Sequence, residues 1–548
     1  MEFKKNQIVE LYIDDIGNEG EGIGHIDGYA LFLKDAVIGD KVRAKIIKTK
    51  KNYGFARVEE VIEASKDRVS PRCSKARQCG GCTLQHLAYE KQLEYKFNKV
   101  KNCLERIGGL ENIEEKMEPI LGMEEPFYYR NKAQFPVGYD KEGNLITGFY
   151  AGRTHHIIDC THCMIQHPVN EQILLKVLDY MKKNNITAYD EKTHKGLVRH
   201  IVTRVGFKTG EIMVCLVVNG SKKNLRNLEM LVDSLTEVEG MTSICVNINK
   251  EKTNRILGSK IEEVYGKPYI YDYIGNVKYQ IGPLSFFQVN PTQTKVLYEK
   301  AMEYADLKGE EIVWDLYCGI GTISLFLAQK AKKVYGVEIV KEAIDDARLN
   351  AKMNGFDNAE FFVGKAEEVL PREYEKNGVY ADTIVVDPPR KGCDSKLLET
   401  MVKMAPKRIV YVSCDPATLA RDLKVLSEQG YEVEKVCAVD QFSHSSHVET
   451  VCLLSREKVD GYVNVDLDTD KIVSKSKTGT ATYKEIKEYI NDKYGFTVSS
   501  LNIAQIKDKC GLDKRKNYNK GAEGHKVPAC PEKKEKAILD AFEHFGLV

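Results

Sequence analysis

A cysteine stands at the end of a strongly apolar run, where a nucleophile could be placed. Residues 409–413 read as a buried strand that ends at Cys414, and Pro416 can occupy the first position of a following helix. The thiol is then expected near helix N-terminal N–H groups, which favour a thiolate. A thiolate can attack an electron-poor double bond, so Cys414 is a candidate nucleophile.

A carboxylate could serve as the matching base. Glu449 stands near the beginning of the last predicted strand of the same region, in the run HVETVCLL. A carboxylate there could remove a proton from a substrate. Acidic residues also commonly begin edge strands, so a purely structural role for Glu449 stays open.

A strand, a glycine turn and a helix start at residues 312–325 predict a nucleotide-type cofactor site. Gly319 and Gly321 would let a cofactor approach the backbone, and Glu338 ends the next strand, 17 residues after Gly321, where it could bind ribose hydroxyls. A nicotinamide cofactor and S-adenosylmethionine (SAM) both fit this layout. Asp315 before the turn and the missing third glycine favour SAM. Asp387 is expected at the same sheet edge.

Three cysteines in the pattern C-x5-C-x2-C could share one metal centre. They are Cys73, Cys79 and Cys82, and Cys160 or Cys163 could supply a fourth thiolate. Both a zinc ion and a 4Fe-4S cluster accept four thiolates. Four histidines near Cys163 keep zinc open, while the separation of about 80 residues between the two groups modestly favours iron–sulfur; these histidines are His155, His156, His162 and His167.

Together a nucleophile, a methyl donor and a base specify one reaction. Uracil C5 is too weak a nucleophile to accept a methyl group directly, but a thiolate that adds at C6 makes C5 enolate-like. A base must then remove the C5 proton so that the thiolate can leave. The residues therefore predict methylation of uracil at C5.

Four regions are expected to position these residues. Residues 1–62 read as short strands of an OB-type barrel, residues 63–265 as a central α+β domain, residues 266–458 as a doubly wound α/β domain, and residues 459–548 as a C-terminal extension. Residues 41–57 hold seven Lys or Arg and no acid; among them, Lys48, Lys50, Tyr53 and Phe55 are candidate RNA contacts. A solvated basic edge is the competing interpretation.

The composition of the chain limits the classes of protein and partner that the sequence allows. The chain has 548 residues and a formal net charge of +1, which excludes a uniformly basic coat but not local patches. The sequence shows no apolar stretch of membrane-spanning length and no signal peptide, so we expect a cytoplasmic protein without a membrane partner. In a reducing compartment, clustered cysteines among the fifteen present favour metal binding or catalysis over disulfides.

In combination these motifs resemble one family, the iron–sulfur-containing 23S ribosomal RNA (uracil-5-)-methyltransferases. The resemblance covers residues 1 to about 456 and rests on the cysteine pattern with SFFQVN, DLYCGIG, GVEIV, DPPRKG, SCDPATLARDL and HVETV. It implies a Rossmann-like SAM methyltransferase domain, an N-terminal TRAM barrel that binds RNA, and a central iron–sulfur domain, all in an α/β protein.

The resemblance also implies residue roles. It places a 4Fe-4S cluster on Cys73, Cys79, Cys82 and Cys163, SAM against Gln288, Tyr317, Glu338 and Asp387, and catalysis on Cys414 and Glu449. Arg130 is expected to meet RNA. Ribosomal RNA is favoured as the target, and the enzyme is expected to act as a monomer. The alternatives are a transfer RNA uracil-5 methyltransferase, a base amino-methyltransferase and a non-catalytic iron–sulfur RNA-binding protein.

The C-terminal extension lies outside this pattern. Its residues 507–526 carry a net charge of +4, from seven lysines and arginines against three acids. This segment could touch RNA or could be a solvated helical appendage.

Overall fold

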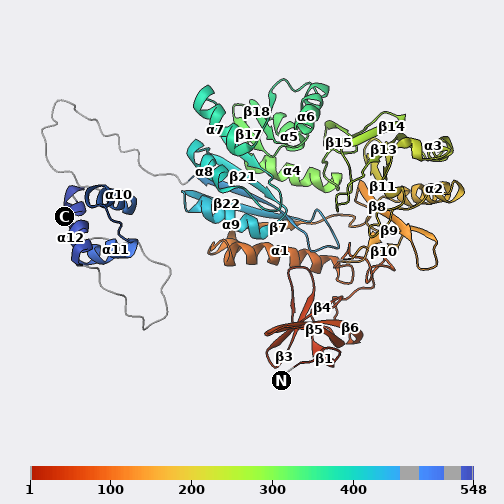
Figure 1. Ribbon diagram of the computed structural model, residues 1–548, viewed down its shortest axis with the longest axis horizontal. Coiled ribbons are helices and arrows are strands. Elements are labelled where there is room, and N and C mark those ends of the chain that lie inside the picture. The colour runs from red at the N-terminus through yellow and green to blue at the C-terminus, as the bar shows by residue number, and fades with distance from the viewer. Residues whose placement is uncertain (1–2, 153, 457–480, 511–531, 546, 548) are drawn as a thin grey trace. The chain divides into compact units, whose positions relative to one another are not determined.

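The computed structural model describes residues 3–152, 154–456, 481–510, 532–545 and 547 (Figure 1). The chain divides into two compact units, residues 1–458 and 459–548. No helix in these described stretches is long and apolar enough to cross a membrane.

The N-terminal strands of the first unit form one six-stranded sheet in the order β1-β5-β6-β4-β3-β2. Gly24 lies so close to the backbone of β1 that a Cβ atom would meet the carbonyl oxygen of Tyr12 at 2.2 Å. The inward faces supply a small core around Leu31, Leu33 and Ile46. The strands are β1 (Ile8–Tyr12), β2 (Asp15–Ile16), β3 (Gly22–Ile26), β4 (Tyr29–Lys34), β5 (Lys41–Thr49) and β6 (Tyr53–Glu63).

The central region is a seven-stranded, mostly antiparallel sheet in the order β10-β9-β8-β11-β12-β13-β14. Its helices contribute apolar residues such as Ile173 and Leu231 to a core with the strands. Its elements are β8 (Lys132–Tyr139), β9 (Leu145–Tyr150), β10 (Ile157–Asp159), α2 (Val169–Lys183), β11 (Val198–Val205), β12 (Ile212–Val218), the 3-10 turn η2 (Lys222–Asn224), α3 (Leu228–Thr236), β13 (Met241–Ile248) and β14 (Lys260–Gly266).

The expected doubly wound domain is present as an eight-stranded sheet in the order β19-β18-β17-β20-β21-β23-β22-β7. The first five strands run parallel, and β23 runs antiparallel to both neighbours. Its strands are β17 (Ile312–Leu316), β18 (Lys333–Glu338), β19 (Ala359–Val363), β20 (Thr383–Val386), β21 (Arg408–Ser413), β22 (Tyr431–Val439) and β23 (Glu449–Arg456), preceded by the hairpin β15 (Ile270–Ile274) and β16 (Val277–Ile281).

Six helices accompany these strands and bury apolar residues on both faces of the sheet. They are α4 (Pro291–Ala305), α5 (Thr322–Ala328), α6 (Lys341–Met353), α7 (Ala366–Asn377), α8 (Ser395–Met404) and α9 (Pro416–Ser427). As the sequence predicted, Pro416 takes the first position of α9.

A segment that we expected in the central domain contributes to this sheet instead. Strand β7 (Met117–Leu121) pairs parallel with β22 as the edge strand. Helix α1 (Tyr89–Arg106) packs beside α9, and the 3-10 turn η1 (Ile113–Lys116) connects α1 to β7. Residues 89–121, which the expected boundary at residue 265 assigned to the central domain, therefore pack with the eight-stranded sheet.

The second unit contains α10 (Tyr483–Tyr494), α11 (Ser500–Lys509) and α12 (Glu532–His544). Ile486, Ile503 and Phe542, one from each helix, are fully buried in a shared core. Thr482 and Glu485 form a capping box at the start of α10. Most of the basic segment 507–526, the proposed RNA contact, lies outside the described residues.

Candidate active site

One edge of the eight-stranded sheet gathers the predicted catalytic and cofactor residues. The parallel strands β17, β18, β20 and β21 end there, at Leu316, Glu338, Val386 and Ser413. Because β23 runs antiparallel to β21, with Thr450 opposite Ser413, its first residue, Glu449, lies at the same edge. Open α/β sheets bind ligands at this edge.

A cavity of about 740 Å³ opens at that edge. It brings together Cys414, Glu449 and six of the seven predicted cofactor residues, namely Gln288, Asp315, Tyr317, Gly319, Glu338 and Asp387.

The seventh, Gly321, does not line this cavity. It caps α5 with φ of +81°, and a Cβ atom there would lie 3.2 Å from Ala347 and Phe361. Gly321 therefore serves the turn and its packing, and its contact with a cofactor stays a prediction. Gly319, with φ of +55°, has nothing within 4 Å of a Cβ position and does line the cavity.

The side of the cavity predicted to bind the cofactor is rich in carboxylates. Glu338 accepts hydrogen bonds from the backbone N–H groups of Gly319 (3.3 Å) and Val340 (3.0 Å). Asp315 is fully buried and accepts a hydrogen bond from Ser324, while its Oδ1 atom has no partner among the described residues. Burial raises the pKa values of both Asp315 and Asp387 to about 7. A cationic ligand such as SAM would offset this cost.

The electrostatics of Cys414 differ from the sequence prediction. Burial raises its pKa to about 11, the carboxylates of Glu449 and Asp387 add to the rise, and Arg390 opposes it. The side chain of Asp415 accepts the N–H groups of Ala417 (3.0 Å) and Thr418 (3.2 Å) at the start of α9. Those donors are therefore taken up by Asp415, and the protein without ligands holds Cys414 as a thiol.

Glu449 has the environment of a general base. It is 4% exposed, and burial, followed by the charge of Asp387, raises its pKa to about 8, with Arg390 acting in the opposite direction. A carboxyl group with a pKa near the working pH exchanges protons readily.

The cavity is also lined by residues that the site prediction did not include, and four of them bear on substrate contact: Phe286, Arg390, Phe442 and His447. Phe286 is 71% exposed despite its apolar ring, which suits contact with a planar base. Two of the four could have been found from their motifs, since Phe286 lies in SFFQVN and Arg390 in DPPRKG.

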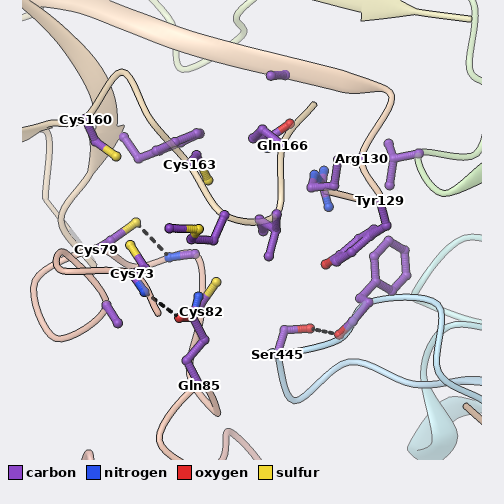
Figure 2. Close-up of a pocket in the computed structure, with 18 of the residues that line it drawn as sticks. Cys73, Cys79, Cys82, Gln85, Tyr129, Arg130, Cys160, Cys163, Gln166 and Ser445 are labelled. Atoms are coloured by element: carbon purple, nitrogen blue, oxygen red, sulfur yellow. Dashed lines mark hydrogen bonds between the residues drawn. The ribbon is translucent and has the colours of Figure 1, made fainter. Parts of the chain in front are cut away.

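A second cavity, of about 500 Å³, is lined by five cysteines. Figure 2 shows Cys73, Cys79 and Cys82 from one loop around the same space as Cys160 and Cys163 from another. The first loop also lies close to the turn between β9 and β10, since a Cβ atom on Gly80 would lie 3.0 Å from the Cα atom of Gly152.

The cysteine cavity is basic, and two of its cysteines are protonated in the protein without ligands. Burial raises the pKa of Cys163 to about 11 and that of Cys82 to about 12, so both are thiols at neutral pH. The lining contains Lys75, Arg130, Lys132 and Arg390 and no acidic residue.

Neither a metal ion nor histidine ligation is evident from the geometry. Within the described residues, no three His, Cys, Asp or Glu side chains are arranged so that they could hold a metal ion. None of the four histidines considered as zinc ligands lines the cysteine cavity; His162 instead faces Glu171 at 3.0 Å and His167 packs against Phe207.

The predicted RNA contacts lie in two places. Lys48, Lys50 and Tyr53 are exposed on the N-terminal sheet, and Phe55 is half-buried. Tyr53 and Phe55 form an aromatic group with Phe32 of the paired strand β4, with ring centroids 5.7–5.8 Å apart. Phe32 joins this group only through the pairing of β4 with β6. Arg130 lies instead at the cysteine cavity.

Comparisons with known proteins agree with this architecture. The tRNA (uracil-5-)-methyltransferase family model matches residues 88–457, and the TRAM domain model matches residues 2–58. Proteins named as RNA methyltransferases are similar to this chain. The one from Clostridium tetani is 53% identical over 453 residues, and that from Halalkalibacterium halodurans is 52% identical over 451 residues. Each alignment covers 82% of this chain and 97% of the relative.

A solved structure is also similar. The tRNA (uracil-54, C5)-methyltransferase of Pyrococcus abyssi, in complex with S-adenosyl-L-homocysteine, has a TM-score of 0.66 and 29% identity, and the match covers 81% of this chain and 100% of that one. The chain therefore belongs to the tRNA (uracil-5-)-methyltransferase family. It is a SAM-dependent RNA methyltransferase with an N-terminal TRAM domain.

Proposed function

We propose that this enzyme methylates C5 of a uridine in RNA through a covalent bond between Cys414 and C6, and that its target lies in 23S ribosomal RNA. The observation that carries the proposal is the shared cavity: a cysteine and a buried carboxyl group at one sheet edge, beside the carboxylates that suit SAM. When bound, SAM supplies an electrophilic methyl group.

The proposed methylation proceeds in three steps. The Cys414 thiol loses its proton to solvent and its sulfur bonds to C6, while the electrons of the C5–C6 double bond move towards C5 and the C4 carbonyl. C5 then accepts the methyl group, whose electrons stay on the donor's sulfur and leave a neutral thioether. Glu449 removes the C5 proton, the C5–C6 double bond reforms, and the Cys414 thiolate leaves.

Forming the thiolate requires a lower pKa at Cys414. The charge of Asp387 raises this pKa, and Arg390 lowers it. A cation bound beside Asp387 would cancel part of the opposing charge, so Cys414 is expected to ionise more readily after the donor binds. This couples the reactive thiolate to the loaded enzyme.

The cysteine cavity is proposed to hold a 4Fe-4S cluster on Cys73, Cys79, Cys82 and Cys163, with Cys160 as an additional thiol. The support is the convergence of the two loops and the basic, acid-free lining, which suits an anionic thiolate-bound cluster. We propose that the cluster is structural and joins the two loops.

A base amino-methyltransferase would not need Cys414, and the Arg390 that follows Asp-Pro-Pro differs from the aromatic residue usual in that class. A non-catalytic RNA-binding protein would leave the cavity around Cys414 unexplained. The uracil-5 reaction uses both Cys414 and the cavity around it.

Mapping 5-methyluridine in total RNA tests both parts of the proposal. RNA from a strain lacking the gene should lose the modification at one or two 23S positions, and the wild-type gene but not Cys414→Ala should restore it. Loss only in transfer RNA would move the target to that class. An unchanged map in every RNA would refute uracil-5 methylation.

A further inference from the structure

Residues 440–447, which we call the bridging segment, lie between the two cavities. They connect β22 to β23 and lead directly to Val448 and Glu449. The side chains of Phe442 and His447 belong to the lining of both the catalytic cavity and the cysteine cavity.

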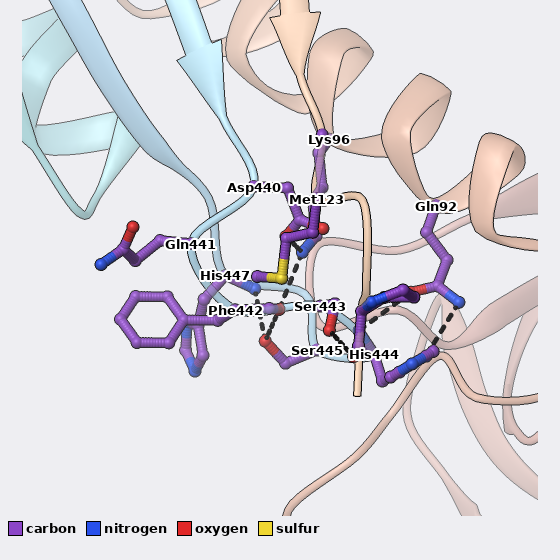
Figure 3. Close-up of polar contacts among 12 residues, drawn as sticks. Gln92, Lys96, Met123, Asp440, Gln441, Phe442, Ser443, His444, Ser445 and His447 are labelled. Atoms are coloured by element: carbon purple, nitrogen blue, oxygen red, sulfur yellow. Dashed lines mark hydrogen bonds and ion pairs between the residues drawn. The ribbon is translucent and has the colours of Figure 1, made fainter. Parts of the chain in front are cut away.

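Helix α1 contacts the bridging segment through Lys96, as Figure 3 shows. The ammonium of Lys96 lies 2.5 Å from Oδ1 of Asp440 and donates to the carbonyl oxygen of Phe442 at 2.9 Å. Both side chains of the ion pair are completely buried. Tyr89 donates to the other Asp440 oxygen at 2.7 Å. These contacts fix the backbone that carries the Phe442 ring.

Other contacts extend this attachment along the segment. Lys99, three residues after Lys96 and so on the same face of α1, donates to the carbonyl oxygens of Ser446 (2.9 Å) and of Asn18 (2.8 Å) in the TRAM domain. The carbonyl oxygen of His444 accepts the N–H groups of Thr83 (2.8 Å) and Leu84, immediately after Cys82.

A buried ion pair usually adds little to the stability of a fold compared with apolar residues in its place. Removing two charges from water costs several kcal/mol per ion, and apolar residues of similar size often stabilise a fold equally well. What an ammonium adds is directional: its N–H donors can bond a carboxylate and a carbonyl group at once. Lys96 uses that capacity on Asp440 and the Phe442 carbonyl.

We propose that Lys96 and Asp440 are positioning residues for the RNA substrate, because they hold the bridging segment so that Phe442 and His447 face the nucleotide entering the catalytic cavity. This rests on the proposed uridine-methylating function for the identity of the substrate. Within the described part of the chain, the pair forms hydrogen bonds with Tyr89 and Phe442 and not with Tyr317, Glu338 or Asp387, so the pair should influence RNA and not SAM.

The test replaces Lys96 and Asp440 together in one variant. Either single substitution would leave one buried charge unpaired and could unfold the protein, so the variant is the double substitution Lys96→Met with Asp440→Leu. Its kcat/KM for RNA should fall about 10- to 100-fold, as small misplacements of substrate-positioning groups do. The Kd for SAM should stay within about twofold of wild type, because the pair acts through the segment. Amide hydrogen exchange should accelerate in residues 440–447 and not in β20.

A matched control is Lys101→Met, which removes the partly exposed Lys101–Glu114 pair from the same helix and should match wild type in all three measurements. Unchanged exchange in residues 440–447, an unchanged kcat/KM for RNA, or a parallel loss of SAM binding in the double variant would overturn the positioning role. A wild-type enzyme that forms no 5-methyluridine would refute the proposed function, whereas a variant as active as a working wild type refutes only this inference.

Discussion

Replacing Glu449 with Gln should change how stability depends on pH. Burial raises the pKa of Glu449 from 4.5 to about 8. Below pH 4.5 the carboxyl group is protonated in both the folded and the unfolded state, and its contribution to stability is fully present. Above pH 4.5 the unfolded chain loses this proton while the folded protein keeps it, which favours unfolding. As the pH rises from 4.5 to 8, that contribution is lost at about 1.4 kcal/mol per pH unit, about 5 kcal/mol in all.

The single tryptophan gives a local readout of this effect. Trp314 is completely buried in β17 of the same sheet, so its fluorescence during denaturation reports this domain. The wild type should lose stability relative to Glu449→Gln between pH 5 and 8, with no further relative change above about pH 9. Glu342→Gln, which removes an exposed carboxylate from α6, should follow the wild type. A difference between wild type and Glu449→Gln that is constant with pH would refute the assignment of a protonated, buried Glu449.

The same ionisation should appear in catalysis: with base ionisation limiting, the single-turnover rate should rise about tenfold from pH 7 to pH 9, and a flat profile would contradict Glu449 as the base. Cys79→Ser should lower iron and acid-labile sulfide content while the matched variant Cys160→Ser retains both; equal loss in the two would contradict the ligand set. Tyr53→Ala should weaken RNA binding by about 1–3 kcal/mol through lost stacking. Lys50→Ala should mainly reduce the salt dependence of binding, by about 0.7 in the slope of log K against log salt concentration. Normal binding by both variants would show that the TRAM sheet does not contact RNA.

Local sequence patterns were sufficient to predict that the candidate cofactor residues gather at one sheet edge. The parallel strands and their turn residues follow from short-range apolar runs and glycines, so Gly319, Glu338 and Asp387 could be placed in one cavity before the fold was known. Gly321 occupies the same turn but serves its packing. The sequence could not indicate this role, because Phe361, which packs against Gly321, comes from a later strand.

Features that depend on long-range pairing could not be predicted in this way. Strand β7 joins β22 across more than 300 residues, and no local signal marks that partner. The raised pKa of Cys414 has the same origin: the sequence suggests a helix start that favours the thiolate, but Asp415 occupies its N–H groups, and Glu449 and Asp387 arrive from other strands. The attachment of Lys96 to Asp440 likewise joins residues 344 positions apart.

The central claim is that Cys414 forms a covalent bond to the target uridine, and trapping that bond tests it most directly. RNA containing 5-fluorouridine at the target offers Glu449 no C5 proton to remove, so the adduct should persist after methyl transfer. Mass spectrometry of the digested complex should then find the methylated nucleotide on the peptide that contains Cys414, in wild type and not in Cys414→Ala. An adduct on another cysteine, or complete methylation of normal RNA by Cys414→Ala, would contradict the account.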